Sequence, residues 1–171
     1  MRRRAFVDTN FIIAAHEARL WKSLSKSHDL ETVEQCREEC HTGCQNRDPE
    51  TWIDDADLLA SLARPPHPVD DVMRSMVLVK RGGAVLDKGE LDIWAAVLAD
   101  PGTWIVSGPD TASMKFGIYN GYGDRLLSME DLVADRKDFQ RRRLPSQYHR
   151  KFLDQVRAKC FEEAGRIPRK P

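Results

Sequence analysis

Two short apolar segments, each closely followed by an aspartate, constrain the fold of this chain most strongly. Residues 4–8 read Arg-Ala-Phe-Val-Asp, and residues 103–107 read Thr-Trp-Ile-Val-Ser shortly before Asp110. Both segments have the length and apolar character of a buried strand. The chain between them is mostly helical in pattern. This alternation predicts an α/β fold with a parallel sheet, in which ligands bind beyond the carboxyl ends of the strands.

Further elements of both kinds lie between and after these segments. Residues 28–33 are a candidate second strand and residues 125–128 a candidate last strand. The proline-rich residues 64–68 are predicted to form a loop. Apolar periodicity predicts helices at residues 34–41, 50–63, 69–80, 90–99 and 129–134, with shorter ones after Asn10 and Asp110.

The charges are segregated along the chain. The 171 residues carry 27 Lys or Arg and 27 Asp or Glu, so the formal net charge is zero. Residues 134–171 hold 12 of the basic residues and five of the acidic ones, while residues 1–133 hold 15 and 22. We therefore predict an acidic domain over residues 1–135 and a basic extension over residues 136–171. Such asymmetry is typical of chains that contact nucleic acid.

Targeting signals are not evident in the sequence. Arg2, Arg3 and Arg4 imitate the start of a signal peptide, but Asp8 and Asn10 interrupt the apolar run that follows. No apolar run reaches the 18 residues of a candidate membrane helix. The sequence therefore predicts a cytoplasmic protein that does not enter a membrane.

Three of the four cysteines are spaced as neighbours on one face of a helix. Cys36, Cys40 and Cys44 follow the i, i+4, i+8 pattern. The favoured interpretation is a helix that buries small thiols, as free cysteines often are. A metal site that includes His41 is the alternative, although this spacing does not match structural zinc motifs.

Four acidic residues are the candidates for chemistry. Asp8 and Asp110 follow strands, Glu38 lies within a helix, and Asp92 lies near the start of another. Carboxylates that converge repel one another unless a cation neutralises them. Oxygen ligands of this kind suit Mg²⁺ or Mn²⁺, and such ions support phosphodiester hydrolysis.

Each of these acids also has an ordinary structural interpretation. Asp8 can cap a helix, Asp92 can complement a helix dipole, and Asp110 can stabilise a turn. Glu38 lies among other acids and can belong to a solvated helix face. Taken singly, therefore, none of the four identifies a site.

Together, the motifs that contain these acids resemble those of PIN-domain nucleases. The opening Phe-Val-Asp-Thr-Asn of residues 6–10 is similar to the first family motif, and residues 32–38 resemble the second. Residues 89–99, with Asp92 before an alanine-rich helix, resemble the third motif. Residues 104–107 followed by Asp110 resemble the last, so the likeness covers about residues 4–135.

The resemblance implies a three-layer α/β/α domain with a central, mainly parallel sheet. The basic C-terminal extension, predicted to be helical, lies outside the resemblance. It implies an endoribonuclease that binds Mg²⁺ or Mn²⁺ through Asp8, Glu38, Asp92 and Asp110. Asn10 and Ser107 match supporting polar positions. Many relatives are toxins of toxin–antitoxin pairs, so an antitoxin partner and a homodimer are further implications. Glu39 competes with Glu38 for its position, and Glu90 competes with Asp92.

The basic extension contains an amphipathic helix, predicted over residues 146–164. Its apolar stripe needs a partner, which could be the domain itself, a second copy or another protein. The candidate RNA-binding residues are Arg141, Arg142, Arg143, Arg150 and Lys151. Basic side chains of this kind bind phosphates with release of counterions, or attract the substrate from a distance.

Two other functions are alternatives to the nuclease. A catalytically lapsed PIN-like domain would serve as an RNA- or protein-binding module. A haloacid-dehalogenase-type phosphatase needs an acid two residues after its nucleophilic aspartate, and Asn10 stands at that position.

Overall fold

The computed structural model describes residues 2–42, 52–133 and 136–165, and it contains a three-stranded parallel sheet. The central strand β1 (Arg3–Val7) pairs with β2 (His28–Glu31) on one side and with β3 (Ile105–Ser107) on the other. Each strand overlaps a segment that the sequence predicted, and β1 begins one residue before its segment. The predicted α/β fold with a parallel sheet is therefore confirmed.

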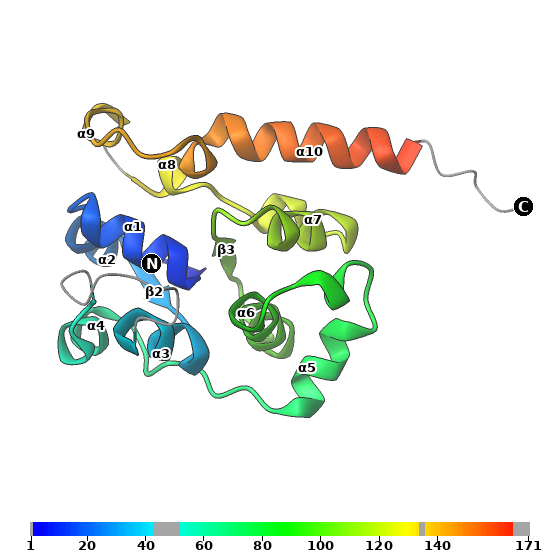
Figure 1. Cartoon of the computed structure of the whole chain (residues 1–171), viewed down its shortest axis with the longest axis horizontal. Coiled ribbons are helices and arrows are strands. Elements are labelled where there is room, and N and C mark those ends of the chain that lie inside the picture. The colour runs from blue at the N-terminus through cyan, green and yellow to red at the C-terminus, as the bar shows by residue number, and fades with distance from the viewer. Residues whose placement is uncertain (1, 43–51, 134–135, 166–171) are drawn as a thin grey trace, which may run out of the picture.

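Helices connect the strands and cover them, as Figure 1 shows. Several begin at a side chain that caps the first turn, among them Asp54, Asp70 and Ser128, so that otherwise unpaired backbone N–H groups are satisfied. The α-helices of the described residues are α1 (Thr9–Glu17), α2 (Trp21–Ser27), α3 (Glu34–Thr42), α4 (Asp55–Ser61), α5 (Asp71–Leu78), α6 (Lys88–Ala99), α7 (Thr111–Tyr119), α8 (Met129–Leu132), α9 (Arg136–Arg141) and α10 (Arg150–Gly165). Short 3₁₀ turns lie at Gly83–Val85, Gly123–Arg125 and Ser146–Tyr148.

The core is divided between the two faces of the sheet. Alternate residues of β1 point to opposite faces, so Ala5 and Val7 join one apolar cluster while Phe6 joins the other. The first cluster includes side chains of α1, α2, α4 and α8. The second is built largely on α6, α7 and α10, with Trp94 at its centre. Helices thus pack against both faces.

Several predicted elements differ from the structure. Residues 125–128 do not form a strand, and only Leu126 makes an isolated bridge to Val106 of β3. β3 ends at Ser107, so it offers only a short edge to this segment, and the Leu127 N–H donates to the Val106 carbonyl at 3.1 Å. The helix predicted over residues 50–63 begins at Asp55, although residues 50 and 51 lie outside the described residues. The sequence did not predict α2 or α9.

The C-terminal extension packs on the domain. Figure 1 shows α10 running beside α7, and Leu153, Val156 and Cys160 of α10 are buried in the second cluster. Glu163 of α10 pairs with Lys115 of α7 at 3.4 Å. The apolar stripe of the predicted helix is therefore covered mainly by the domain itself.

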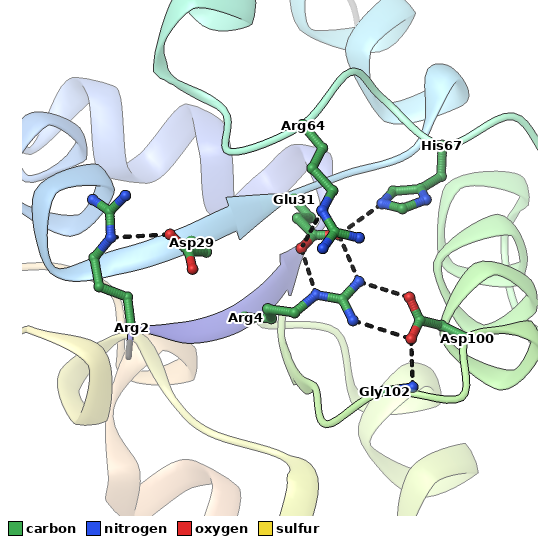
Figure 2. A network of polar contacts seen from close by, with 8 residues as sticks. All are labelled: Arg2, Arg4, Asp29, Glu31, Arg64, His67, Asp100 and Gly102. Atoms are coloured by element: carbon green, nitrogen blue, oxygen red, sulfur yellow. Dashed lines mark hydrogen bonds and ion pairs between the residues drawn. The ribbon is translucent and has the colours of Figure 1, made fainter.

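A network of charges joins the sheet to the end of α6. The Arg4 guanidinium binds the buried Glu31 carboxylate through two hydrogen bonds of 2.7 and 2.9 Å. Arg4 also binds Asp100, and His67 reaches Glu31 at 2.7 Å (Figure 2). Burial alone would raise the pKa of Glu31, but the bonds from Arg4 and His67 hold it below its ordinary value. This network fixes the edge of the sheet.

Two further expectations concern the cysteines and membranes. Cys36 and Cys40 are both buried on α3, as the helical spacing predicted, while Cys44 lies outside the described residues. Among the helices that the structure describes, none combines the length and the apolar character needed to cross a bilayer.

Candidate functional site

Asp8 and Asp110 lie at the same edge of the sheet. Val7 of β1 is paired with Ser107 of β3, so the chain leaves both strands at neighbouring points. Asp8 then caps α1, where its Oδ1 accepts a hydrogen bond of 2.7 Å from the Phe11 N–H. Asp110 caps α7 in the same way through the Ala112 N–H at 2.6 Å. Each aspartate is thus both a helix cap and part of a shared acidic edge.

A small acidic pocket opens beside Asp8. The cavity measures about 10 Å³, which is close to the space that a single water molecule or a small ion occupies. The pocket is lined by Asp8, Thr9, Asn10, Cys36, Glu39, Asp87, Gly89 and Glu90. Its size excludes an organic cofactor and suits a monatomic ligand.

The start of α6 brings two of these acids to the pocket. Asp87 caps the helix through the Glu90 N–H at 2.8 Å, and Glu90 Oε2 accepts in return from the Asp87 N–H at 3.2 Å. This reciprocal capping box turns the Glu90 side chain back toward the beginning of the helix. Its other oxygen, Oε1, is buried and receives no hydrogen bond from any described donor.

The electrostatic environment raises the pKa of several of these carboxyls. Burial, together with the charges of Asp87 and Asp110, raises the pKa of Asp8 to about 7. Burial and contact with Asp110 raise the pKa of Glu90 to about 9. The pKa of Asp87 is raised by partial burial of its carboxylate and by nearby Glu39. Unless a cation is present, this cluster therefore retains protons at neutral pH.

The structure brings Glu39, not Glu38, to the pocket. Cys36 and Cys40 are fully buried, and Glu38 lies about 200° around the helix from Cys36, on the exposed face. Glu39 lies beside the buried face, where its Oε2 accepts a hydrogen bond from the Thr9 hydroxyl at 2.5 Å. The cysteine register was visible in the sequence and could have separated the two glutamates.

Asp92 likewise does not line the pocket; Glu90, its competitor for the third motif position, does. The buried Asp92 carboxylate is held by two hydrogen bonds from Arg74 of α5, at 2.7 and 2.9 Å. Asp92 therefore ties α6 to α5 rather than joining the cluster. Asp87 also lines the pocket and was not predicted as a site residue. The sequence Asp87-Lys88-Gly89-Glu90 has the spacing of a capping box, which could have indicated that Asp87 and Glu90 lie together.

The supporting residues predicted from the sequence lie near the cluster. Asn10 lines the pocket. Ser107 is 1% exposed, and its hydroxyl has no hydrogen-bond partner among the described residues. The next residue, Gly108, packs so closely on Asp8 that an added Cβ would lie 2.4 Å from Asp8 Oδ2. The backbone after β3 therefore fixes the position of the Asp8 carboxylate.

The candidate RNA-binding residues lie in the sequence on either side of Tyr148, which connects the extension to the start of α1. Tyr148 is buried, and its hydroxyl donates to the Asn10 carbonyl at 3.1 Å, which brings residues 146–148 to the start of α1. Arg141, Arg143 and Lys151 are exposed. The other two are engaged within the chain, as Arg142 pairs with Asp138 and Arg150 with Asp131.

The residues of the cluster fit a divalent cation chemically, although they are not arranged as a finished coordination shell. Within the described ranges, no three His, Cys, Asp or Glu side chains are placed so that they could hold a metal ion as they stand. The unpartnered Glu90 oxygen, however, and the direct contact between the Glu90 and Asp110 carboxyl groups both require a proton or a cation. Asp8, Glu39, Asp87, Glu90 and Asp110 are the residues that would hold it.

Comparison with protein-family models, with curated proteins and with solved structures gave no significant match.

Proposed function

We propose that this chain is a metal-dependent ribonuclease of the PIN-domain kind that hydrolyses RNA phosphodiester bonds with Mg²⁺ or Mn²⁺. The observation that carries the proposal is the pair of buried carboxyl groups of Asp8 and Glu90, which have no cationic partner among the described residues and lie at the edge of a parallel sheet where ligands of such folds bind. The small pocket, the motif likeness around Asp8 and the basic extension support it.

The roles of the residues follow from their positions. Asp8, Glu90 and Asp110 would supply oxygen ligands, and the helix caps and the capping box restrict the orientations of these side chains. Asn10 offers a polar side chain at the pocket to a phosphate or a water molecule. Mg²⁺ or Mn²⁺, when bound, would supply positive charge that activates water and stabilises the phosphate in the transition state.

The exposed basic residues would draw RNA toward an otherwise acidic surface. Arg141, Arg143 and Lys151 flank Tyr148, which touches the start of α1 beside the pocket. Their attraction for a phosphate backbone weakens as salt concentration rises. An antitoxin partner and a homodimer remain predictions of the family resemblance, and co-purification of the chain with its genomic neighbour would test the first.

The test is RNA cleavage with Mn²⁺ by the purified wild type and by paired variants. We expect Glu90→Gln to lose cleavage by more than the 10–100-fold that loss of an outer partner of a metal ligand typically costs. Glu38→Gln is the matched control, because Glu38 lies on the exposed face of α3. Equal cleavage by the wild type and Glu90→Gln would refute the proposal.

The alternative is a PIN-like module that binds RNA or protein without cleaving it. It is favoured by the positions of two of the four motif acids, which are not at the pocket. The Asp92 carboxylate is hydrogen-bonded by Arg74, and Glu38 is exposed. RNA binding without any Mn²⁺-dependent cleavage by the wild type would support this module. The phosphatase is not proposed, because Asn10 supplies no acid at the pocket.

A further inference from the structure

A surface cavity lies where the C-terminal extension turns into α10. Residues 142–149 join α9 to α10 (Figure 1), and the cavity is formed by this segment and the first turns of α10. Its volume is about 430 Å³, within the range of about 300–1,000 Å³ that sites for organic ligands have. The lining residues are Leu144, Ser146, His149, Lys151, Phe152 and Gln155. None of them lines the acidic pocket, so this is a second place for a ligand.

The apolar part of the cavity is held in place by the fold. Phe152 is half-buried, since it packs against the second apolar cluster while it also lines the cavity. Leu144 packs against the first cluster in the same way, and its carbonyl accepts a hydrogen bond of 3.1 Å from the His149 ring. A ligand that stacks on Phe152 therefore has little side-chain freedom to restrict. A nucleobase is a flat ligand of this kind, and stacking on aromatic side chains is how many proteins bind single-stranded RNA.

The polar groups of the cavity match the other parts of a nucleotide. Lys151 is exposed and, among the described residues, forms no ion pair, so its ammonium group is available to a phosphate. The Gln155 amide and the Ser146 hydroxyl both donate and accept hydrogen bonds. Groups of this kind can bind the edge of a base and a ribose 2′-hydroxyl. Base, sugar and phosphate therefore each have a complementary group.

A second cavity on α10 shows why this one suits an anion better. The second cavity shares Lys151, but it is also lined by Arg150, Glu130 and Asp154. Its two carboxylates offset its two basic side chains and repel a phosphate. The cavity that contains Phe152 has no acidic residue in its lining, so the attraction of Lys151 for a phosphate is not offset there.

The cavity adjoins the segment that reaches the proposed active site. Ser146 and His149 stand on either side of Tyr148 in the sequence, and the buried Tyr148 hydroxyl donates to the Asn10 carbonyl at 3.1 Å. Burial and the negative charge of Asp8 raise the pKa of Tyr148, which places this hydroxyl within electrostatic range of that acid. An RNA strand held in the cavity is thereby placed next to the helix that Asp8 caps.

We infer that this cavity is a nucleotide-binding subsite for single-stranded RNA, in which a base stacks on Phe152 and a phosphate binds Lys151. The inference rests on the proposed function for the identity of the substrate, and it adds that the substrate is a single strand. The bases of a duplex are already stacked on one another, so a duplex has no free base to offer to Phe152.

The test is the fluorescence anisotropy of a short, fluorescein-labelled single-stranded RNA of mixed sequence, with full-length protein in EDTA at low salt. The chelator stops metal-dependent cleavage, so RNA binding and the proposed nuclease activity can fail separately. We expect Phe152→Leu, which keeps an apolar side chain, to weaken binding about fivefold or more. We expect Lys151→Gln to weaken binding and to reduce the salt dependence of log affinity by about 0.7 in slope. The wild type should bind the single strand more tightly than a duplex of the same sequence.

Two residues of the same helix provide matched controls. Phe161 is 72% exposed and Lys159 is exposed, and neither lines the cavity. Phe161→Leu and Lys159→Gln should therefore bind RNA much as the wild type does. Unchanged affinity in either cavity variant, an equal loss in the controls, or equal affinity for single strand and duplex would overturn the assignment. Absence of RNA binding by the wild type would also overturn it, and would leave the cavity to a protein partner.

Discussion

Replacing Asp8 by asparagine is expected to stabilise the fold, although the same change removes the central acid of the proposed site. The Asp8 carboxylate is 9% exposed and lies among other acids, and its pKa is raised from 3.8 to about 7. Asparagine caps helices as well as aspartate does, so the hydrogen bond from the Phe11 N–H is retained. Only the buried charge is lost.

The magnitude and the pH window follow from the shift. Between pH 4 and 7 the native state binds more protons at Asp8 than the unfolded state does, so the free energy of unfolding falls as pH rises through this window. At about 1.4 kcal/mol per pKa unit, a shift to about 7 corresponds to an upper limit of about 4 kcal/mol. Because neighbouring carboxyls titrate with Asp8, we expect about 2–4 kcal/mol between Asp8→Asn and the wild type above pH 7.

The assay is urea unfolding at pH 4 and pH 8 in the presence of a chelator. The difference between Asp8→Asn and the wild type should be small at pH 4 and large at pH 8. Asp70→Asn is the matched control, because Asp70 caps α5 through the Met73 N–H but is exposed. Its effect should stay within about 0.5 kcal/mol at both pH values. Addition of Mn²⁺ at pH 8 should stabilise the wild type more than Asp8→Asn. A difference that does not grow with pH would refute the reasoning.

Three further substitutions separate structural from functional roles. Asp92→Asn should lower the free energy of unfolding by about 1–3 kcal/mol, because it weakens the ion pair with Arg74. RNA cleavage by the folded variant should persist. Lost cleavage at unchanged stability would contradict this structural role. Gly108→Ala should displace the Asp8 carboxylate and weaken Mn²⁺ binding at least tenfold in calorimetry, since the new Cβ would lie 2.4 Å from Asp8 Oδ2. Glu31→Gln should cost about 2–4 kcal/mol in guanidinium unfolding at pH 7. Because the native carboxylate has a pKa below the ordinary 4.5, the effect should fade only as the pH falls below 4.5; a constant effect would argue against the ion network.

The sheet and its acidic edge could be predicted from the sequence, because the signals are local. The apolar residues of β1 and β3 have few alternatives to burial, and Asp8 and Asp110 follow them closely. Parallel pairing then places both aspartates at one edge, as the register of Val7 with Ser107 shows. No distant contact is needed for this step.

The choice between neighbouring acids depended on helix register and on a distant partner. For Glu38 and Glu39, the register is set by the two buried cysteines of α3, and the 3.6-residue spacing places Glu39 nearer to the buried face than Glu38. For Glu90 and Asp92 no local signal was sufficient. Arg74 reaches Asp92 from α5, 18 residues earlier in the chain, and the sequence does not show which acid an arginine will meet.

The buried acids of this fold are of two kinds, and their partners distinguish them. Glu31 and Asp92 are 1% and 3% exposed, and each carboxylate is held by an arginine, as Figure 2 shows for Glu31. Asp8 and Glu90 are buried to a similar degree, yet among the described residues neither has a cationic partner, and burial and neighbouring acids raise the pKa of both. A fold selected for stability alone would pair these charges or replace them. The unpaired acids therefore mark the position where a cation is expected, and the paired ones hold the fold together around it.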